Sequence, residues 1–129
     1  MKKTILSITL AMLGILVLVM PTLAATTVSL SPASISVMPW QNFNVSVIVN
    51  PQGTNNYAEK VELKYPADLL QVNSFSFGNT WMALTQPGYD LTDNTNGVLL
   101  KSAGYPGGFS SATTFGTVSF YAKKTGNGT

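Results

Sequence analysis

The chain has 129 residues, with seven lysines, no arginine, five acidic residues, and neither histidine nor cysteine. Two of the lysines are Lys2 and Lys3, and the chain that follows them has no net charge. This balance excludes nucleic-acid binding through a basic surface. The missing histidine and cysteine exclude imidazole and thiolate metal sites and catalysis that depends on either residue, so no cofactor is expected.

The first 24 residues have the pattern of a secretion signal. Lys2 and Lys3 form its charged start, residues 4–20 are an uncharged apolar run, and small residues then place cleavage after Ala24. An uncleaved N-terminal anchor is the alternative, because the run is long for a signal and short for a membrane-spanning helix. Both forms predict a secreted or cell-surface protein, which contacts a membrane only through this segment and only if the segment stays uncleaved.

From Ala25 onward the residues predict one all-β domain with a single core. Short alternating runs rich in Val, Thr, Ser and aromatic residues are separated by Gly, Pro and Asn, which is typical of short strands and turns. The remaining length suits one core and not two. In chain order we expect strands near residues 27–30, 34–37, 43–50, 60–65, 70–77, 89–91, 98–105 and 115–120.

The run at residues 70–77 contains a change of parity. Leu70 and Val72 fall on one face of a regular strand, whereas Phe75 and Phe77 fall on the other. A bulge near residues 73–74 would bring both aromatic rings into the core.

The segment around Asn96-Gly97 predicts a tight hairpin turn that leads into the strand at 98–105. The glycine-rich residues 106–111 are expected to form a loop. Strands and turns at this regular spacing favour a two-sheet antiparallel β-sandwich, preceded by an N-terminal signal helix.

Four stretches stand out by their order and spacing along the chain. The first is an opening strand at 27–32, and the second is a Ser-Val pair followed by a turn and a Phe-x-Val-x-Val strand at 36–47. The third is a strand, a turn and Leu-x-Val at 61–72, and the fourth is Gly-Thr-Val-Ser-Phe-Tyr-Ala-Lys at 116–123. This arrangement resembles the cohesin domains and the related carbohydrate-binding modules. The resemblance covers residues 27–124 and implies a jelly-roll (cohesin-like, immunoglobulin-like) topology.

The chain also departs from that family. In cellulosomal cohesins an Asn-x-Asp pair at the start of the third strand helps to hold a dockerin partner, and the matching positions here are Ala58 and Lys60. The family's final strand has no counterpart. We therefore expect residues 25–129 to be a cohesin-like domain that is truncated before its last strand or completed by a neighbour.

The acidic residues predict no enzyme. A glycosidase needs two carboxylates that face each other across a cleft, yet Glu59 and Glu62 fall on opposite faces of one strand. The loop at 93–97 lacks the hard ligands of a calcium loop. We expect no catalytic residue and no metal site.

The aromatic residues carry the leading functional hypothesis, an exported non-catalytic module that binds a polysaccharide or surface glycan. Sugar rings stack on flat aromatic side chains. The candidate ligand-binding residues are Trp40, Trp81, Tyr57, Tyr89 and Tyr105. For both tryptophans the alternative is that they close the ends of the core, since tryptophan is highly buried on average.

Two other functions remain open. In a protein-interaction or scaffolding module, a dockerin-like domain would dock on the sheet face around residues 59–65 and 98–103, with Lys60, Glu62, Lys64 and Lys101 as candidate contacts. In a structural surface or filament subunit, a donated strand would complete the open sheet edge.

Overall fold

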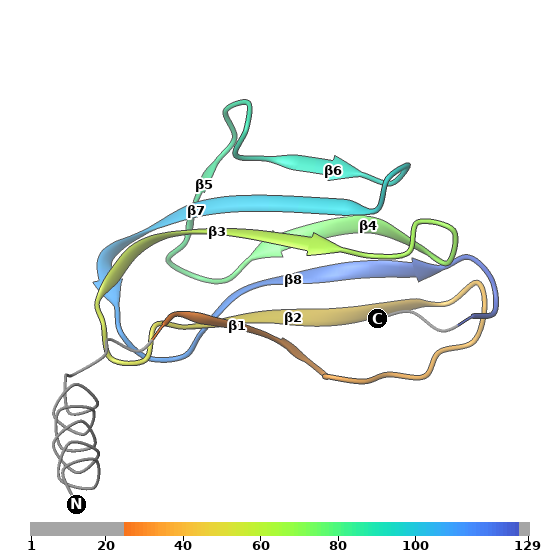
Figure 1. Ribbon diagram of the computed structural model, residues 1–129, viewed down its shortest axis with the longest axis horizontal. Helices are drawn as coiled ribbons and strands as arrows, with labels where there is room; N and C mark the ends of the chain where they lie inside the picture. The colour runs from red at the N-terminus through yellow and green to blue at the C-terminus, as the bar shows by residue number, and fades with distance from the viewer. Residues whose placement is uncertain (1–24, 127–129) are drawn as a thin grey trace, which may run out of the picture.

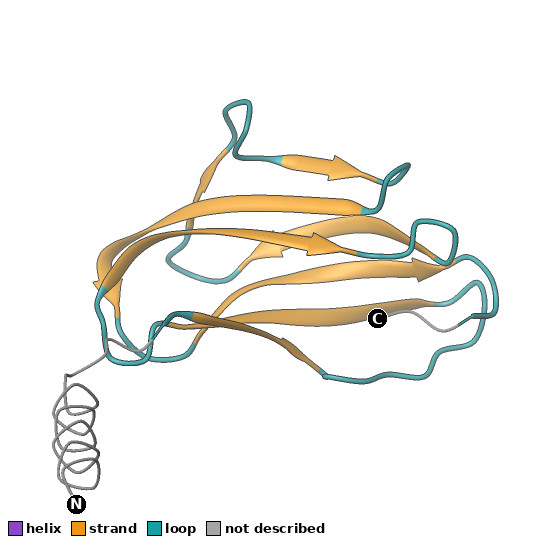
Figure 2. Ribbon diagram, in the orientation of Figure 1, coloured by secondary structure: helices purple, strands orange, loops and turns teal. Residues whose placement is uncertain are grey.

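The computed structural model describes residues 25–126, which form eight strands and no helix (Figures 1 and 2). The described residues therefore contain no helix that could span a membrane. The signal expected at 1–24 lies outside the described residues. The strands are β1 (Thr27–Ser31), β2 (Asn42–Asn50), β3 (Asn56–Lys64), β4 (Leu70–Phe77), β5 (Met82–Leu84), β6 (Leu91–Asp93), β7 (Val98–Phe109) and β8 (Thr113–Ala122).

The strands form two antiparallel sheets. Sheet A has the order β1-β2-β8-β4, and sheet B has the order β3-β7-β5, with β6 also paired to β7. The chain changes sheet after β2, β3, β4 and β7, so successive segments enclose a common core (Figure 1). This confirms the prediction of an all-β protein with two antiparallel sheets.

The core lies between the sheets and follows the period-2 pattern of the sequence. Val47, Val49 and Val118 are fully buried, while the residues between them on β2 and β8 are half-buried. Each such side chain stabilises the fold by about 1.5–3 kcal/mol through burial. At one end, the Phe115 ring lies 4.9 Å from the Trp81 ring in an edge-to-face arrangement.

The bulge predicted near residues 73–74 is confirmed. The register between β4 and β8 shifts between Val72 and Ser74, so that Phe75 pairs with Val118 and Phe77 lies opposite Gly116. Both rings then pack against the core. The parity change in the sequence was therefore a direct signal of the extra residue.

One predicted strand and one predicted loop were wrong. Residues 34–37 form no strand, and residues 106–109 belong to β7 and not to a loop. Gly107 and Gly108 have positive φ values of 84° and 77°, which let an irregular strand continue to the buried Phe109. The glycines that suggested a loop thus allow a bulged strand.

The predicted hairpin at 93–97 is present, and it joins β6 to β7. Asp93 pairs directly with Val98, so the connection has four residues and is longer than the tight turn expected. The short strand β5 was not predicted.

Candidate functional site

The outer face of sheet B presents one continuous surface. On β3 and β7, side chains that face the core alternate with side chains that face outward, because the strand period is two. Leu99 and Ala103 are buried against sheet A, which assigns Leu100, Ser102 and Gly104 to the outer side.

Apolar side chains gather on the part of this face formed by β7 and its neighbours β5 and β6. Strands β5 and β6 pair with consecutive stretches of β7, Leu91 opposite Leu100 and Leu84 opposite Ser102. Met82 is 63% exposed and Leu91 is 47% exposed. We call this surface the outer patch, and it consists of Met82, Leu84, Tyr89, Leu91 and Leu100.

A row of charged side chains on β3 borders the outer patch. Lys60, Glu62 and Lys64 are exposed and share the outward parity, as the sequence predicted. The Lys60 ammonium lies 5.3 Å from the centre of the Tyr89 ring, which links the row to the patch. The Lys64–Glu62 pair is 3.7 Å apart and solvated, so both charges stay available to a partner.

The structure places Lys101 apart from this row. Lys101 pairs with Val61, whose side chain is buried, so both point toward sheet A. The Lys101 ammonium bonds the Asp90 carboxylate at 2.7 Å and lies 5.6 Å from the Phe75 ring of β4. The prediction that grouped Lys101 with the exposed charges of β3 was wrong about its orientation.

Ser102 lies beneath the outer face, between Lys60 on β3 and Leu84 on β5. It is 2% exposed, and within residues 25–126 its hydroxyl has no hydrogen-bond partner. A buried hydroxyl without a partner costs the fold stability.

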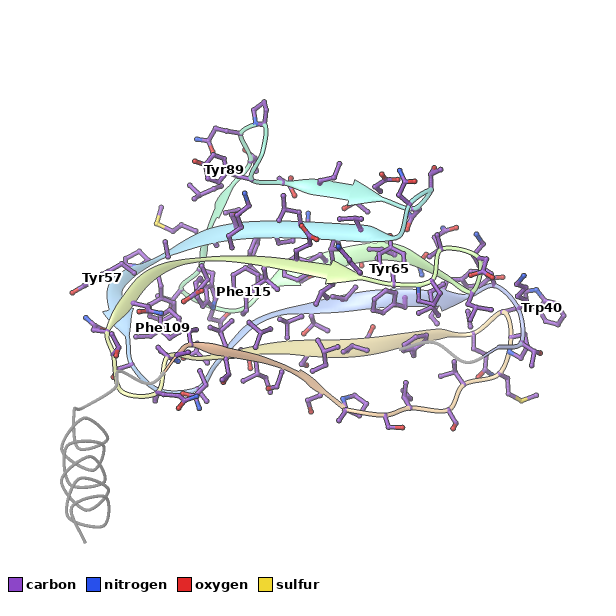
Figure 3. All side chains as sticks on the ribbon, in the orientation of Figure 1. Trp40, Tyr57, Tyr65, Tyr89, Phe109 and Phe115 are labelled. Carbon is purple, nitrogen blue, oxygen red and sulfur yellow. The ribbon has the colours of Figure 1, made fainter. Side chains whose placement is uncertain are left out.

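The candidate sugar-binding aromatics do not form one platform. Figure 3 shows Trp40 at one end of the molecule, Tyr57 near the other end, and Tyr89 at the loop beyond β5. Trp81 is 8% exposed, and its indole N–H donates to the Thr114 carbonyl oxygen at 2.9 Å, so it closes the core. Tyr105 lies within β7 and packs edge-to-face against Trp81.

No arrangement in the described part points to catalysis or metal binding. Residues 25–126 contain no group of three or more side chains that could ligate a metal. Hydrogen bonds from the Asn96 side chain and from the Asn96 and Thr95 backbone hold the pKa of Asp93 below its usual value. Burial, with a lesser effect of Asp93, raises the pKa of Tyr65. The Asp93 shift thus arises from hydrogen bonds within the turn before β7.

The comparisons by sequence find no relatives: no family model and no curated protein match the chain. The fold, in contrast, matches solved structures. The sixth cohesin of scaffoldin B from Acetivibrio cellulolyticus, solved in complex with a dockerin, is 18% identical with a TM-score of 0.54, and the match covers 81% of this chain and 75% of that one.

Two further structures agree with that match. A type I cohesin–dockerin complex from Clostridium thermocellum is 9% identical with a TM-score of 0.57, covering 81% of this chain and 76% of that one. The second type II cohesin module of a scaffoldin from Acetivibrio cellulolyticus is 17% identical with a TM-score of 0.52, covering 80% and 71%. The described part of the chain therefore has a cohesin-like fold.

Proposed function

We propose that the protein is an exported, non-catalytic interaction module of the dockerin-binding type, with a jelly-roll sandwich that docks a partner domain on the outer face of sheet B. The observation that carries this proposal is the outer patch bordered by the charged row of β3. An apolar centre with a polar rim is the usual anatomy of a protein–protein interface.

Two cohesins of similar fold were solved with dockerins bound, which supports a partner of this kind. Positions 58 and 60, where the family resemblance places partner contacts, lie on the same outer face. Here they are Ala58 and Lys60, and both are exposed. Replacing an Asn-x-Asp pair by these residues removes a carboxylate and adds an ammonium, so the partner should carry an acidic group at the matching position.

The alternative of polysaccharide binding receives less support. Trp40, Tyr57 and Tyr89 are exposed but lie on separate parts of the molecule, so one glycan chain would not stack on all three (Figure 3). The comparisons favour a protein partner over a glycan.

Calorimetric titration of the purified protein with a panel of dockerin domains tests the proposal. Leu91→Asp places a charge in the outer patch and should weaken binding at least tenfold, which equals about 1.4 kcal/mol. Ser74→Asp is the matched control, because Ser74 is exposed on β4 of the opposite sheet. A complete lack of binding to the panel, together with retention on polysaccharide gels, would refute the proposal.

A further inference from the structure

The two sheets differ in charge. Six charged residues lie on the strands of sheet B, four of them on β3, whereas the four strands of sheet A contain none. The side chains of sheet A that point away from the core are mostly those of serine, threonine, asparagine and glutamine, with Ile48 and Tyr121 as apolar members. We call these outward-facing residues of β1, β2, β8 and β4 the neutral face.

Three strands place amide and phenol groups in one row across the neutral face. Asn42 of β2 pairs with Tyr121 of β8, and Tyr121 pairs with Gln71 of β4. Beside this row, the Asn73 amide nitrogen donates to the Asn42 amide oxygen at 2.9 Å. Since β8 lies between β2 and β4, this bond fixes both amides above β8. It leaves the Asn42 amide nitrogen and the Asn73 amide oxygen for a ligand.

The spacing of the row matches a chain of sugars. Neighbouring strands lie about 4.8 Å apart, which is close to the length of one pyranose ring in an extended polysaccharide. A polysaccharide that crosses the strands would set successive sugars over β2, β8 and β4. Its hydroxyls would exchange hydrogen bonds with the amides and hydroxyls of the face, and one ring would lie on the Tyr121 side chain.

Trp40 adds a second aromatic surface, two residues before Asn42 and at the end of the molecule (Figure 3). It is 74% exposed and has a positive φ of 65°. A residue other than glycine in this conformation is strained by about 1–3 kcal/mol, and such strain is concentrated at functional sites. The Trp40 N–H donates to the Ala122 carbonyl oxygen at 2.7 Å, and the Ala122 N–H donates to that of Gln41 at 3.0 Å. These bonds hold the indole beside the row.

The composition of the neutral face disfavours other ligands. A nucleic acid or an anionic glycan needs cations, and the four strands have none. Lys123, which follows β8, donates to the Ala67 carbonyl oxygen at 2.8 Å. A protein interface needs an apolar centre, but the centre of this face is polar. Strands added at either edge of sheet A would widen the sheet and leave this face uncovered.

We propose that the neutral face binds an uncharged, extended polysaccharide, which crosses β2, β8 and β4 along Asn42, Tyr121 and Gln71 and stacks on Tyr121 and Trp40. This site lies on the sheet opposite to the outer patch, so it does not depend on the proposed dockerin-type function. A protein with both sites would hold a partner domain and a polysaccharide at the same time.

Calorimetric titration with soluble polysaccharides tests the proposal. Hydroxyethyl cellulose, galactomannan and arabinoxylan are the neutral probes, and carboxymethyl cellulose is the charged comparison for the first. We expect the neutral cellulose derivative to bind at least about tenfold more tightly than the charged one, because the face offers no cation to a carboxylate.

Two variants test the residues of the row. Asn42→Asp should weaken binding of the neutral polymers by about tenfold, since it removes an amide donor and adds a charge that binding must desolvate. The new carboxylate still accepts from Asn73, so the fold should be unaffected. Trp40→Ala should weaken binding by about three- to tenfold through the loss of stacking.

Ser74→Asp separates this site from the outer patch. Ser74 pairs with Ser119 in the next row of the neutral face, so the new charge should weaken polysaccharide binding by about tenfold and leave dockerin binding unchanged. Leu91→Asp should do the reverse. Because each variant is titrated with both kinds of ligand, failure of one proposal is distinguishable from failure of the other.

Three results would overturn the proposal. The first is that none of the neutral polymers binds, and the second is that carboxymethyl cellulose binds as tightly as hydroxyethyl cellulose. The third is binding that is lost in Leu91→Asp and kept in Asn42→Asp, because that pattern places the polysaccharide on the outer patch.

Discussion

Replacing Asn94 by alanine should destabilise the fold by about 2 kcal/mol. The Asn94 carbonyl oxygen accepts from the Tyr65 hydroxyl at 2.6 Å and from the Val72 backbone N–H at 2.8 Å, and its amide nitrogen donates to the Val72 carbonyl at 3.0 Å. One side chain thus joins the turn before β7 to the bulged part of β4. Three hydrogen bonds at about 1 kcal/mol each give about 3 kcal/mol, and partial access of water to the site reduces this figure.

Urea unfolding followed by the fluorescence of the buried Trp81 measures the change. For a slope of about 2 kcal/mol per molar urea, the midpoint should fall by about 1 M without a change of slope. Asn96→Ala is the matched control, because Asn96 is exposed in the same turn and its side chain bonds Asp93 alone. It should cost less than about 0.5 kcal/mol.

Tyr65→Phe removes the hydroxyl and leaves both backbone bonds of Val72 intact, so it should cost about 1 kcal/mol. Because Tyr65 and Asn94 share a hydrogen bond, the double variant should lose less than the sum of the single losses. Equal midpoints for Asn94→Ala and Asn96→Ala would refute the assignment of Asn94 as a link between the sheets.

Three further changes test other parts of the structure. Gly97→Ala should lower the free energy of unfolding, measured in urea, by about 1–3 kcal/mol, because φ is +71° and the new methyl group would overlap the Tyr65 carbonyl oxygen. Gly53 has open space around it, so Gly53→Ala should lower it by less. Trp81→Ala should lower the free energy of unfolding by about 3–5 kcal/mol, because Trp81 is buried. Trp40 is 74% exposed, so Trp40→Ala should lower it by less than about 0.5 kcal/mol. Similar melting temperatures for the two variants would contradict the placement of both side chains. Asp93 has a folded-state pKa below its usual value, so its contribution to stability is complete above pH 3.8 and is lost as pH falls through the folded-state pKa. Asp93→Asn should therefore make the urea midpoint depend less on pH over this range. A pH profile identical to that of the unchanged protein would show that the turn bonds do not favour the carboxylate.

Period-2 patterns predicted the parts of the fold where burial alone determines the strand. Val45, Val47 and Val49 identify β2 because alternate side chains must reach the core. The parity change between Val72 and Phe75 also located a bulge, since one extra residue in the strand lets the side chains before and after it face the same core.

Other features depend on pairing, which a single strand does not reveal. Lys101 belongs to the inner side because β3 and β7 pair with Val61 opposite Lys101, and a shift of one residue would have reversed its direction. Strand β5 has three residues and exists because Met82 and Leu84 find partners on β7. The docking face predicted at 59–65 and 98–103 lies on the same sheet, but it did not include Met82, Leu84 and Leu91. These residues join the outer patch only through the neighbouring placement of β5 and β6.

Mapping the binding face is the most direct test of the account. Hydrogen exchange of the protein, alone and saturated with a dockerin domain that binds it, should show slowed exchange in β5, β6 and β7, with β1 and β4 unchanged. Slowed exchange confined to sheet A, or to the loops around Trp40, would contradict the assignment of the outer face of sheet B as the partner surface.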